Sequence, residues 1–356
     1  MPTLLDLKQL IGSKSRPVPE EAHDAMLRTL TLQDLKALGS LRPLRRIIEL
    51  HIRYRIRSLF AAFQLPCGET LDMMGSTGSI VSGSGALDII IPGLRVPRDL
   101  NLYCPRGSAE AVVKYLASKQ YIIQLPSVTW NNIKAGRLGR FNVNNGVISL
   151  HRFTHVTKPT TVTLVESAAS SPVLPIMFFH NTFLMNYYDA REVRCLYPAL
   201  TFKMIGLHNR SNGFDRLHKQ SLGIKWERLG VSLLWTCETT HSHQAVAPST
   251  VCSLHPSLCQ RADRSSDDGL ALRIPFKTTV KAATEVRLSW QLGYFRWATT
   301  SVEYRDTQVT VHAPATGAGM RYSNTKTAHK MLNWRVYWEN EDDKEGRTDI
   351  ANTSFP

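Results

Sequence analysis

One stretch of the chain, Val81–Pro105, constrains the fold more than any other. It opens with a turn of small residues, Ser82-Gly83-Ser84, and continues after a spacer of fourteen residues into Asp99-Leu100-Asn101-Leu102. Polar and apolar residues alternate in this second piece, which is the pattern of a strand, and side chains two positions apart on a strand share one face. We therefore expect Asp99 and Asn101 on the same face, behind a turn whose backbone can approach a ligand closely.

This order of elements resembles the nucleotidyltransferase superfamily, in which a Gly-Ser turn precedes a strand that carries two acids. The resemblance implies a nucleotide held at Gly83 and Ser84 and Mg²⁺ ions held by carboxylates. Asp99 matches the first acid, whereas Asn101 stands in the place of the second and lacks the charge that Mg²⁺ requires. A third carboxylate should come from a neighbouring strand, on which Glu166 is the one acid. We expect a degenerate, non-catalytic site; the alternative is an active Mg²⁺-dependent nucleotidyltransferase that uses Asp99 and Glu166.

The first 65 residues carry helical patterns. Thr31 and Asp34 form a variant of the capping box, and apolar residues then recur every three or four positions from Ser40 to about Gln64. Leu32–Leu38, followed by this arginine-rich helix, resembles the trailing half of an F-box. The resemblance implies that residues 20–65 dock on a Skp-type adaptor, as in a ubiquitin-ligase substrate receptor. The alternative is a helical cap that packs on the next domain.

A wider resemblance covers most of the chain. Uncharacterised fungal proteins described as F-box-like share a helical start, a Ser-Gly-Ser turn and an Asp-Leu-Asp-Leu strand. Further similar segments are Ile176–Asn186, the turn Leu196-Tyr197-Pro198, and the series Cys252, Cys259, Arg264, Asp267 and Leu270. This resemblance implies an architecture and leaves the activity open.

We expect an α+β fold in three parts: a helical F-box-like segment over residues 1–65, a nucleotidyltransferase-like mixed sheet with helices over 66–190, and a β-rich C-terminal region over 191–356 that ends in an acidic tail. Inside the core, the pattern predicts a helix over 108–119 and a β-hairpin around Asn145-Gly146. It also predicts a strand over Thr161–Glu166 and a buried helix over 173–188.

The six cysteines are scattered and are expected to be reduced thiols. Four residues, Cys237, Cys252, His255 and Cys259, have the chemistry and a workable spacing for tetrahedral Zn²⁺. The alternative is packed thiols and loop histidines. The expected function requires no cofactor; Mg²⁺ enters if the enzyme is active, and Zn²⁺ is a candidate structural ion.

Charge and hydropathy limit the kinds of partner that we expect this chain to bind. Forty-three basic against 29 acidic residues give a net charge of +14, which favours acidic partners. Nucleic acid is only weakly indicated, because Tyr54 is the one aromatic residue interleaved among the arginines of the arginine-rich helix. No run approaches the roughly 18–20 apolar residues that span a membrane. We expect an intracellular protein, cytoplasmic or nuclear, that serves as a binding or adaptor module for a protein partner.

Overall fold

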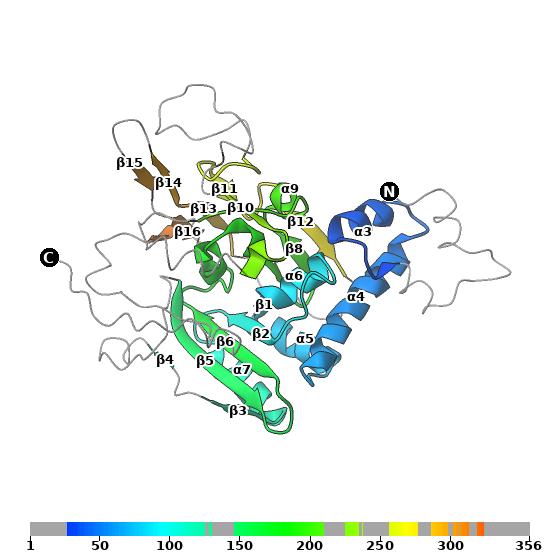
Figure 1. The fold of residues 1–356 in the computed structure, drawn as a ribbon. Helices are drawn as coiled ribbons and strands as arrows, with labels where there is room; N and C mark the ends of the chain where they lie inside the picture. Colours follow the sequence, from blue (N-terminus) through cyan, green and yellow to red (C-terminus); the bar gives the residue numbers. More distant parts are fainter. Residues whose placement is uncertain are drawn as a thin grey trace.

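The computed structural model describes residues 27–124, 128–129, 146–209, 225–234, 237, 256–276, 286–297, 302–305, 307–312 and 319–323 (Figure 1). Within them the chain is an α+β protein built on a mixed sheet, which confirms the expected fold class at that level. The helices near the start of the chain cover one face of this sheet, and strands from the end of the chain cover the other.

The main sheet has nine strands in the described part of the chain. They are β1 Ile80–Ser82, β2 Asp99–Cys104, β3 Tyr121–Ile123, β4 Val128–Thr129, β5 Val147–His155, β6 Thr161–Ser167, β7 Asn186–Tyr188, β8 Glu192–Cys195 and β12 Leu272–Pro275. Their order is β12-β8-β7-β1-β2-β6-β5-β3, with β4 also paired to β5. Strand β2 is parallel to β6 and antiparallel to β1, so the expected strand carrying Asp99 lies in the middle of the sheet.

The helices are explained by local sequence. They are α3 Leu32–Gly39, α4 Arg45–Ala62, α5 Cys67–Thr77, α6 Ser84–Ile90, α7 Ala109–Ser118 and the short α9 Pro198–Thr201. The capping box at Thr31 and Asp34 is confirmed, with both reciprocal hydrogen bonds present. Ser40 was expected to start the next helix, but its hydroxyl donates to Ala37 O and so helps to end α3. Helix α4 ends at Ala62, before Gln64, whose φ is +55°. Pro66 is the N-cap of α5, a helix that the sequence pattern did not predict.

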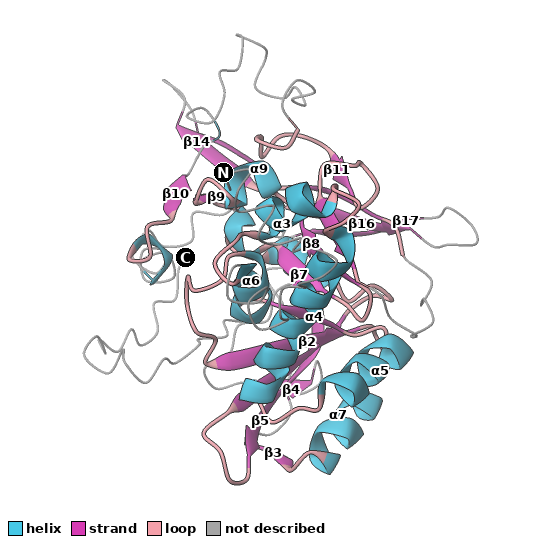
Figure 2. Ribbon diagram, turned by 90° about the vertical axis from the view of Figure 1, so that its right-hand side faces the viewer, coloured by secondary structure: helices cyan, strands magenta, loops and turns pink. Residues whose placement is uncertain are grey.

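Helices α4 to α7 pack on one face of the sheet, and α5 lies beside α7 (Figure 2). Strand β2 contributes Leu100 and Leu102 to this core, where Ile52 and Phe60 of α4 are fully buried with them. Each such side chain stabilises the fold by about 1.5–3 kcal/mol through removal from water. The described residues before 65, which begin at Leu27, therefore share one hydrophobic core with the sheet that follows them.

A single buried arginine fixes the start of the described chain to this core. Arg55 of α4 donates to the carbonyls of Leu27, Leu30 and Ile89 and to His51 Nε2, at 2.6–2.9 Å. One planar guanidinium can serve all of these acceptors because it carries five N–H donors in a fixed geometry.

The opposite face of the sheet carries a second core. Its residues include Ile80, Tyr103 and Val165 from the main sheet, together with Trp290 and Val309. The last two belong to a four-stranded sheet of β11 Arg264–Ser265, β13 Leu288–Gln291, β16 Gln308–His312 and β17 Gly319–Ser323. Two short pairs complete the described strands: β9 Ile205–Leu207 with β10 Ser232–Leu234, and β14 Tyr294–Trp297 with β15 Val302–Arg305.

One expectation for residues 66–190, the helix over 173–188, is wrong, and another, the hairpin around Asn145-Gly146, is described only in its second strand. The apolar run over 173–188 is not one helix: it forms two 3-10 turns, η1 Leu174–Phe178 and η2 Thr182–Leu184, and then strand β7. Pro175 and the Asn181 side chain, which accepts from Leu184 N, divide the run into these short pieces. The first strand of the predicted hairpin lies outside the described residues, whereas its second strand is β5.

Candidate ligand site at the start of strand β2

The expected site residues at the turn and at β2 do come together. Ser82 pairs with Asn101 in the β1–β2 register, so the turn and the start of β2 are adjacent. Gly83 has φ +71°, and a Cβ placed there would lie 3.0 Å from Asn101 Nδ2. Glycine is required at this position both by its left-handed conformation and by the space that the amide occupies. Ser84 follows as the first residue of α6 and is buried.

Asp99 and Asn101 share one face, as the strand pattern predicted. Asn101 Nδ2 donates to Asp99 Oδ2 at 3.1 Å, and the Asn101 side chain is 8% exposed. The amide oxygen of Asn101 is buried and has no hydrogen-bond partner in the described part of the chain. An unpaired buried acceptor costs free energy, so this oxygen marks a place where a donor from a ligand would be stabilising.

The neighbouring strand offers a hydroxyl where a third carboxylate was expected. Thr163 of β6 pairs with Asn101 and is fully buried. Its Oγ1 is also without a hydrogen-bond partner among the described residues, as is Arg152 Nε on the next strand, β5, which pairs with Thr163. The face that carries Asp99 is therefore polar across β2, β6 and β5, with several unsatisfied donors and acceptors.

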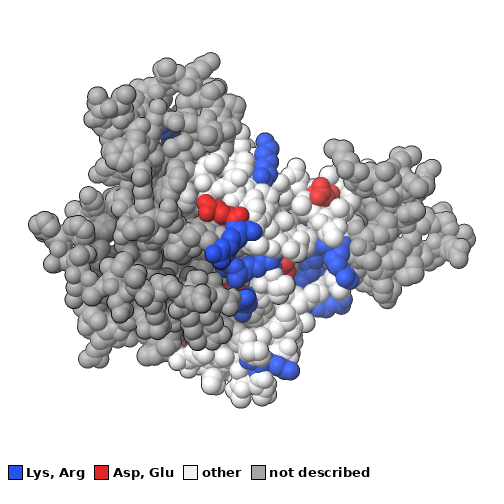
Figure 3. Space-filling model, in the orientation of Figure 1, with Lys and Arg blue, Asp and Glu red and all other residues white. Residues whose placement is uncertain are grey.

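Lys225 lies near Asp99 and near two further cations, Arg95 and Arg98. Burial lowers the pKa of Lys225, the nearby charges of Arg95 and then Arg98 lower it further, and Asp99 opposes them. The charges of Arg95, Asp99 and Arg98 are therefore each close enough to act on Lys225, and the four charges sum to +2. Figure 3 shows lysine and arginine side chains, with a few acidic ones, across the middle of the described surface that faces the viewer in Figure 1. The site is suited to an anion.

The register places Glu166 away from Asp99. In the parallel pair, Asp99 is opposite Thr161, and Glu166 is opposite Cys104 at the far end of both strands. Five residues at about 3.3 Å each separate the two levels by about 16 Å, and the two side chains leave the sheet on opposite faces. Two carboxylates that share catalytic metals must instead lie within reach of ions about 4 Å apart. Glu166 therefore cannot complete the expected metal site.

Glu166 has its own environment at the other end of β6. Its carboxylate accepts from Gly107 N at 2.7 Å and from Ser149 Oγ at 2.7 Å. The same hydroxyl lies 3.2 Å from His151 Nε2. Burial, followed by the Glu166 charge, raises the pKa of Cys104 to about 12, so this thiol stays protonated. These contacts join β5, β6 and the loop after β2, which is a structural role for the carboxylate.

Two of the four candidate zinc ligands are described, and they are adjacent. Cys237 Sγ and Cys259 Sγ are 3.6 Å apart, both side chains are buried, and Arg261 N donates to the second sulfur at 3.3 Å. Two thiolates on one tetrahedral Zn²⁺, each at about 2.3 Å, lie about 3.8 Å apart, so the pair fits. Cys252 and His255 lie outside the described residues.

Arg264, one of the residues in the wider resemblance, has a structural role in packing. It is fully buried, donates to Leu196 O at 3.0 Å and is ion-paired with Asp268. Its guanidinium lies over the rings of Tyr197 and Trp290, at 4.7 and 5.5 Å from their centroids. The Leu-Tyr-Pro turn and the segment that carries Arg264 therefore pack against each other.

Sequence reasoning did not identify Lys225, Arg95, Arg98 or Thr163. Arg95 and Arg98 lie just before Asp99 in the stretch Val81–Pro105, and the pairing of Asn101 with Thr163 could have been sought by aligning the two predicted strands. Lys225 comes from a part of the chain far from the motif. In the part of the chain that the structure describes, no three His, Cys, Asp or Glu side chains form a group that could hold a metal ion.

Comparison with known proteins gave no match: no family model, no curated protein and no solved structure is similar to this chain. Among its described helices, none has the length and apolar character needed to cross a membrane.

Proposed function

We propose that this chain is a non-catalytic, nucleotidyltransferase-like binding protein whose site at Gly83, Asp99 and Asn101 takes a phosphate-bearing ligand without a metal ion. One observation carries the proposal: Lys225 lies close enough to Arg95, Asp99 and Arg98 for each of their charges to act on it. Fixed cations then supply the positive charge that metal ions would otherwise bring to a phosphate group.

The arrangement argues against metal-assisted catalysis for a geometric reason. Catalysis with two ions needs carboxylates that converge. Here the second position is the amide of Asn101, the opposed position on β6 is the hydroxyl of Thr163, and Glu166 is about 16 Å away along the strands. The alternative of an active enzyme using Asp99 and Glu166 therefore has weak geometric support.

The second alternative, a ubiquitin-ligase substrate receptor, depends on an exposed apolar face on the N-terminal helices. The apolar stripe of α4, which includes Ile48, Ile52 and Ile56, is buried in the shared core. This burial favours the interpretation of α3 and α4 as a helical cap. A protein partner of another kind remains compatible with an adaptor role.

The test is a titration of ATP and of inorganic triphosphate against the purified full-length protein, with and without Mg²⁺, read by calorimetry and thermal shift. A ligand that binds only the folded state raises the unfolding midpoint by mass action. We expect binding without Mg²⁺ that weakens at least about tenfold in Lys225→Gln, a change of about 1.4 kcal/mol. Arg228→Gln, which removes an exposed cation three residues away, is the matched control and should bind like the natural protein.

The same experiment separates the alternatives through Asp99. Asp99→Asn removes the negative charge that acts on Lys225, so binding to the proposed site should be retained or should tighten. An active nucleotidyltransferase would give binding that requires Mg²⁺ and is lost in Asp99→Asn. That second result would overturn the proposal.

A further inference from the structure

A separate pocket lies at the other end of the central strands. Its lining includes Ile80, which begins β1, and Pro105, which follows β2, whereas Asp99 begins β2. Leu288 of the four-stranded sheet closes the pocket from the opposite side. The space inside is about 110 Å³, and a single water needs roughly a tenth of that. The pocket therefore has room for a small molecule.

The walls combine apolar side chains with a few polar groups. The apolar lining residues include Met74, Ile80, Val173, Val286 and Leu288. The lining also includes four serines, Ser79, Ser170, Ser171 and Ser266, and three charged residues, Asp189, Arg191 and Arg194. An apolar cavity with a small number of converging polar groups is the usual character of a small-molecule site.

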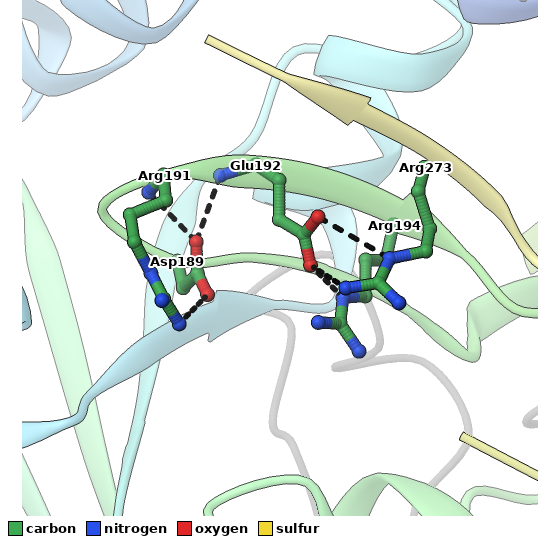
Figure 4. Close-up of polar contacts among 5 residues, drawn as sticks. All are labelled: Asp189, Arg191, Glu192, Arg194 and Arg273. Atoms are coloured by element: carbon green, nitrogen blue, oxygen red, sulfur yellow. Dashed lines mark hydrogen bonds and ion pairs between the residues drawn. The ribbon is translucent and has the colours of Figure 1, made fainter. Parts of the chain in front are cut away.

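The described charged residues at the pocket include more arginines than carboxylates. Glu192 is ion-paired with the side chains of Arg194 and Arg273 (Figure 4). Asp189 Oδ1 accepts from the backbone N–H groups of Arg191 and Glu192 at 2.7 and 2.8 Å. Among the described residues that line the pocket, two arginines, Arg191 and Arg194, stand against one carboxylate, Asp189, and their charges sum to +1. The site therefore suits a single negative charge.

Arg191 is the cation best placed to meet a ligand. Its ion pair with Asp189 is long, at 3.5 Å, and its side chain is 33% exposed. Figure 4 shows its side chain on the same side of the β7–β8 hairpin as that of Arg194, which is 5% exposed and lies over the Tyr187 ring. A guanidinium has five N–H donors in a planar fork, which matches a carboxylate with two parallel hydrogen bonds.

We propose that this pocket binds a small monoanion that carries a carboxylate on a short apolar chain. Arg191 receives the carboxylate, and the serine hydroxyls can donate to the oxygens that the guanidinium leaves open. The apolar chain then lies among Met74, Val173 and Leu288. An inorganic phosphate dianion fits less well, because it brings a second charge and no apolar surface to this lining.

The test uses hexanoate as the probe, with hexanamide and inorganic phosphate as comparison ligands, measured by calorimetry and ligand-observed NMR on the full chain. We expect hexanoate to bind with a Kd below about 1 mM, and hexanamide about tenfold more weakly, because the amide lacks the charge. Arg191→Gln should weaken hexanoate binding by about tenfold. Ser170→Trp, at an exposed position on the lining, should block the pocket without changing any charge.

Arg273→Gln is the matched control. Arg273 contacts Glu192 but does not line the pocket. The substitution removes the same charge as Arg191→Gln from the same neighbourhood, so hexanoate should bind this variant within about twofold of the natural protein. Circular dichroism establishes that each variant is folded. The proposal is overturned by no hexanoate binding at this level, by equal binding of hexanamide, by preference for phosphate, or by equal losses in Arg191→Gln and Arg273→Gln. Because the pocket lies apart from Asp99, none of these outcomes bears on the proposed phosphate site.

Discussion

Asn101 donates a 3.1 Å hydrogen bond from its Nδ2 to Asp99 Oδ2, across the two positions of β2 that share one face. A carboxylate at position 101 could not make this bond and would repel Asp99. The present pair therefore carries one negative charge instead of two, and that charge acts on Lys225, as do the charges of Arg95 and Arg98.

Asn101→Asp tests this relationship directly. The new carboxylate would be mostly buried beside Asp99, so desolvation and like charge should raise the pKa of the pair above its unfolded value. Protonation is then favoured in the folded state, so the variant should lose about 1–3 kcal/mol at pH 7 and recover as the pH falls towards 4. Urea unfolding at several pH values measures this. Asn101→Leu, which removes the bond without adding charge, should show no such recovery, and equal pH profiles for the two variants would refute the explanation.

Arg55→Met should destabilise the fold by more than about 3 kcal/mol, because it leaves the carbonyls of Leu27, Leu30 and Ile89 without their donor. Arg55→Lys should recover only part of the loss, since one ammonium cannot reach all of these acceptors. Arg57→Met, on an exposed position of the same helix, is the control and should cost less than about 0.5 kcal/mol. Urea unfolding provides the comparison. A small effect of Arg55→Met would mean that α3 and α4 are not held to the core by this residue.

We expect His151 to make the stability of the folded state depend on pH. Burial lowers its pKa below the ordinary value, although the Glu166 charge opposes this shift. A histidine whose folded pKa is depressed favours the folded state only while neutral, so its contribution is present above about pH 6.5 and is lost as the pH falls through the lower folded value. Thermal midpoints between pH 7.5 and 5 should fall less steeply in His151→Gln than in the natural protein. Parallel curves would exclude this residue as the cause.

The zinc expectation can be tested by elemental analysis. If Cys237 and Cys259 hold Zn²⁺, the purified protein should contain about one ion per chain, and Cys237→Ser or Cys259→Ser should lose it together with several °C of thermal stability. Cys67→Ser, at a half-buried cysteine elsewhere, should keep the ion. A metal-free natural protein would identify the pair as packed thiols.

The sequence by itself determined the local features of this protein. The capping box at Thr31 and Asp34, the glycine turn at Gly83 and the strand that brings Asp99 and Asn101 to one face all follow from short-range rules of hydrogen bonding and alternation. Each depends on residues within a few positions of one another.

Only the tertiary structure decided which distant groups meet. The register of β2 and β6 sets Thr163, and not Glu166, beside Asn101, and a slip of one residue would have exchanged the faces. Lys225 reaches Asp99 across more than a hundred residues of sequence. The run over 173–188 became turns and a strand because Pro175 and Asn181 interrupt it and β1 offers β7 a partner. Such contacts depend on burial and pairing over the whole chain, which no local pattern contains.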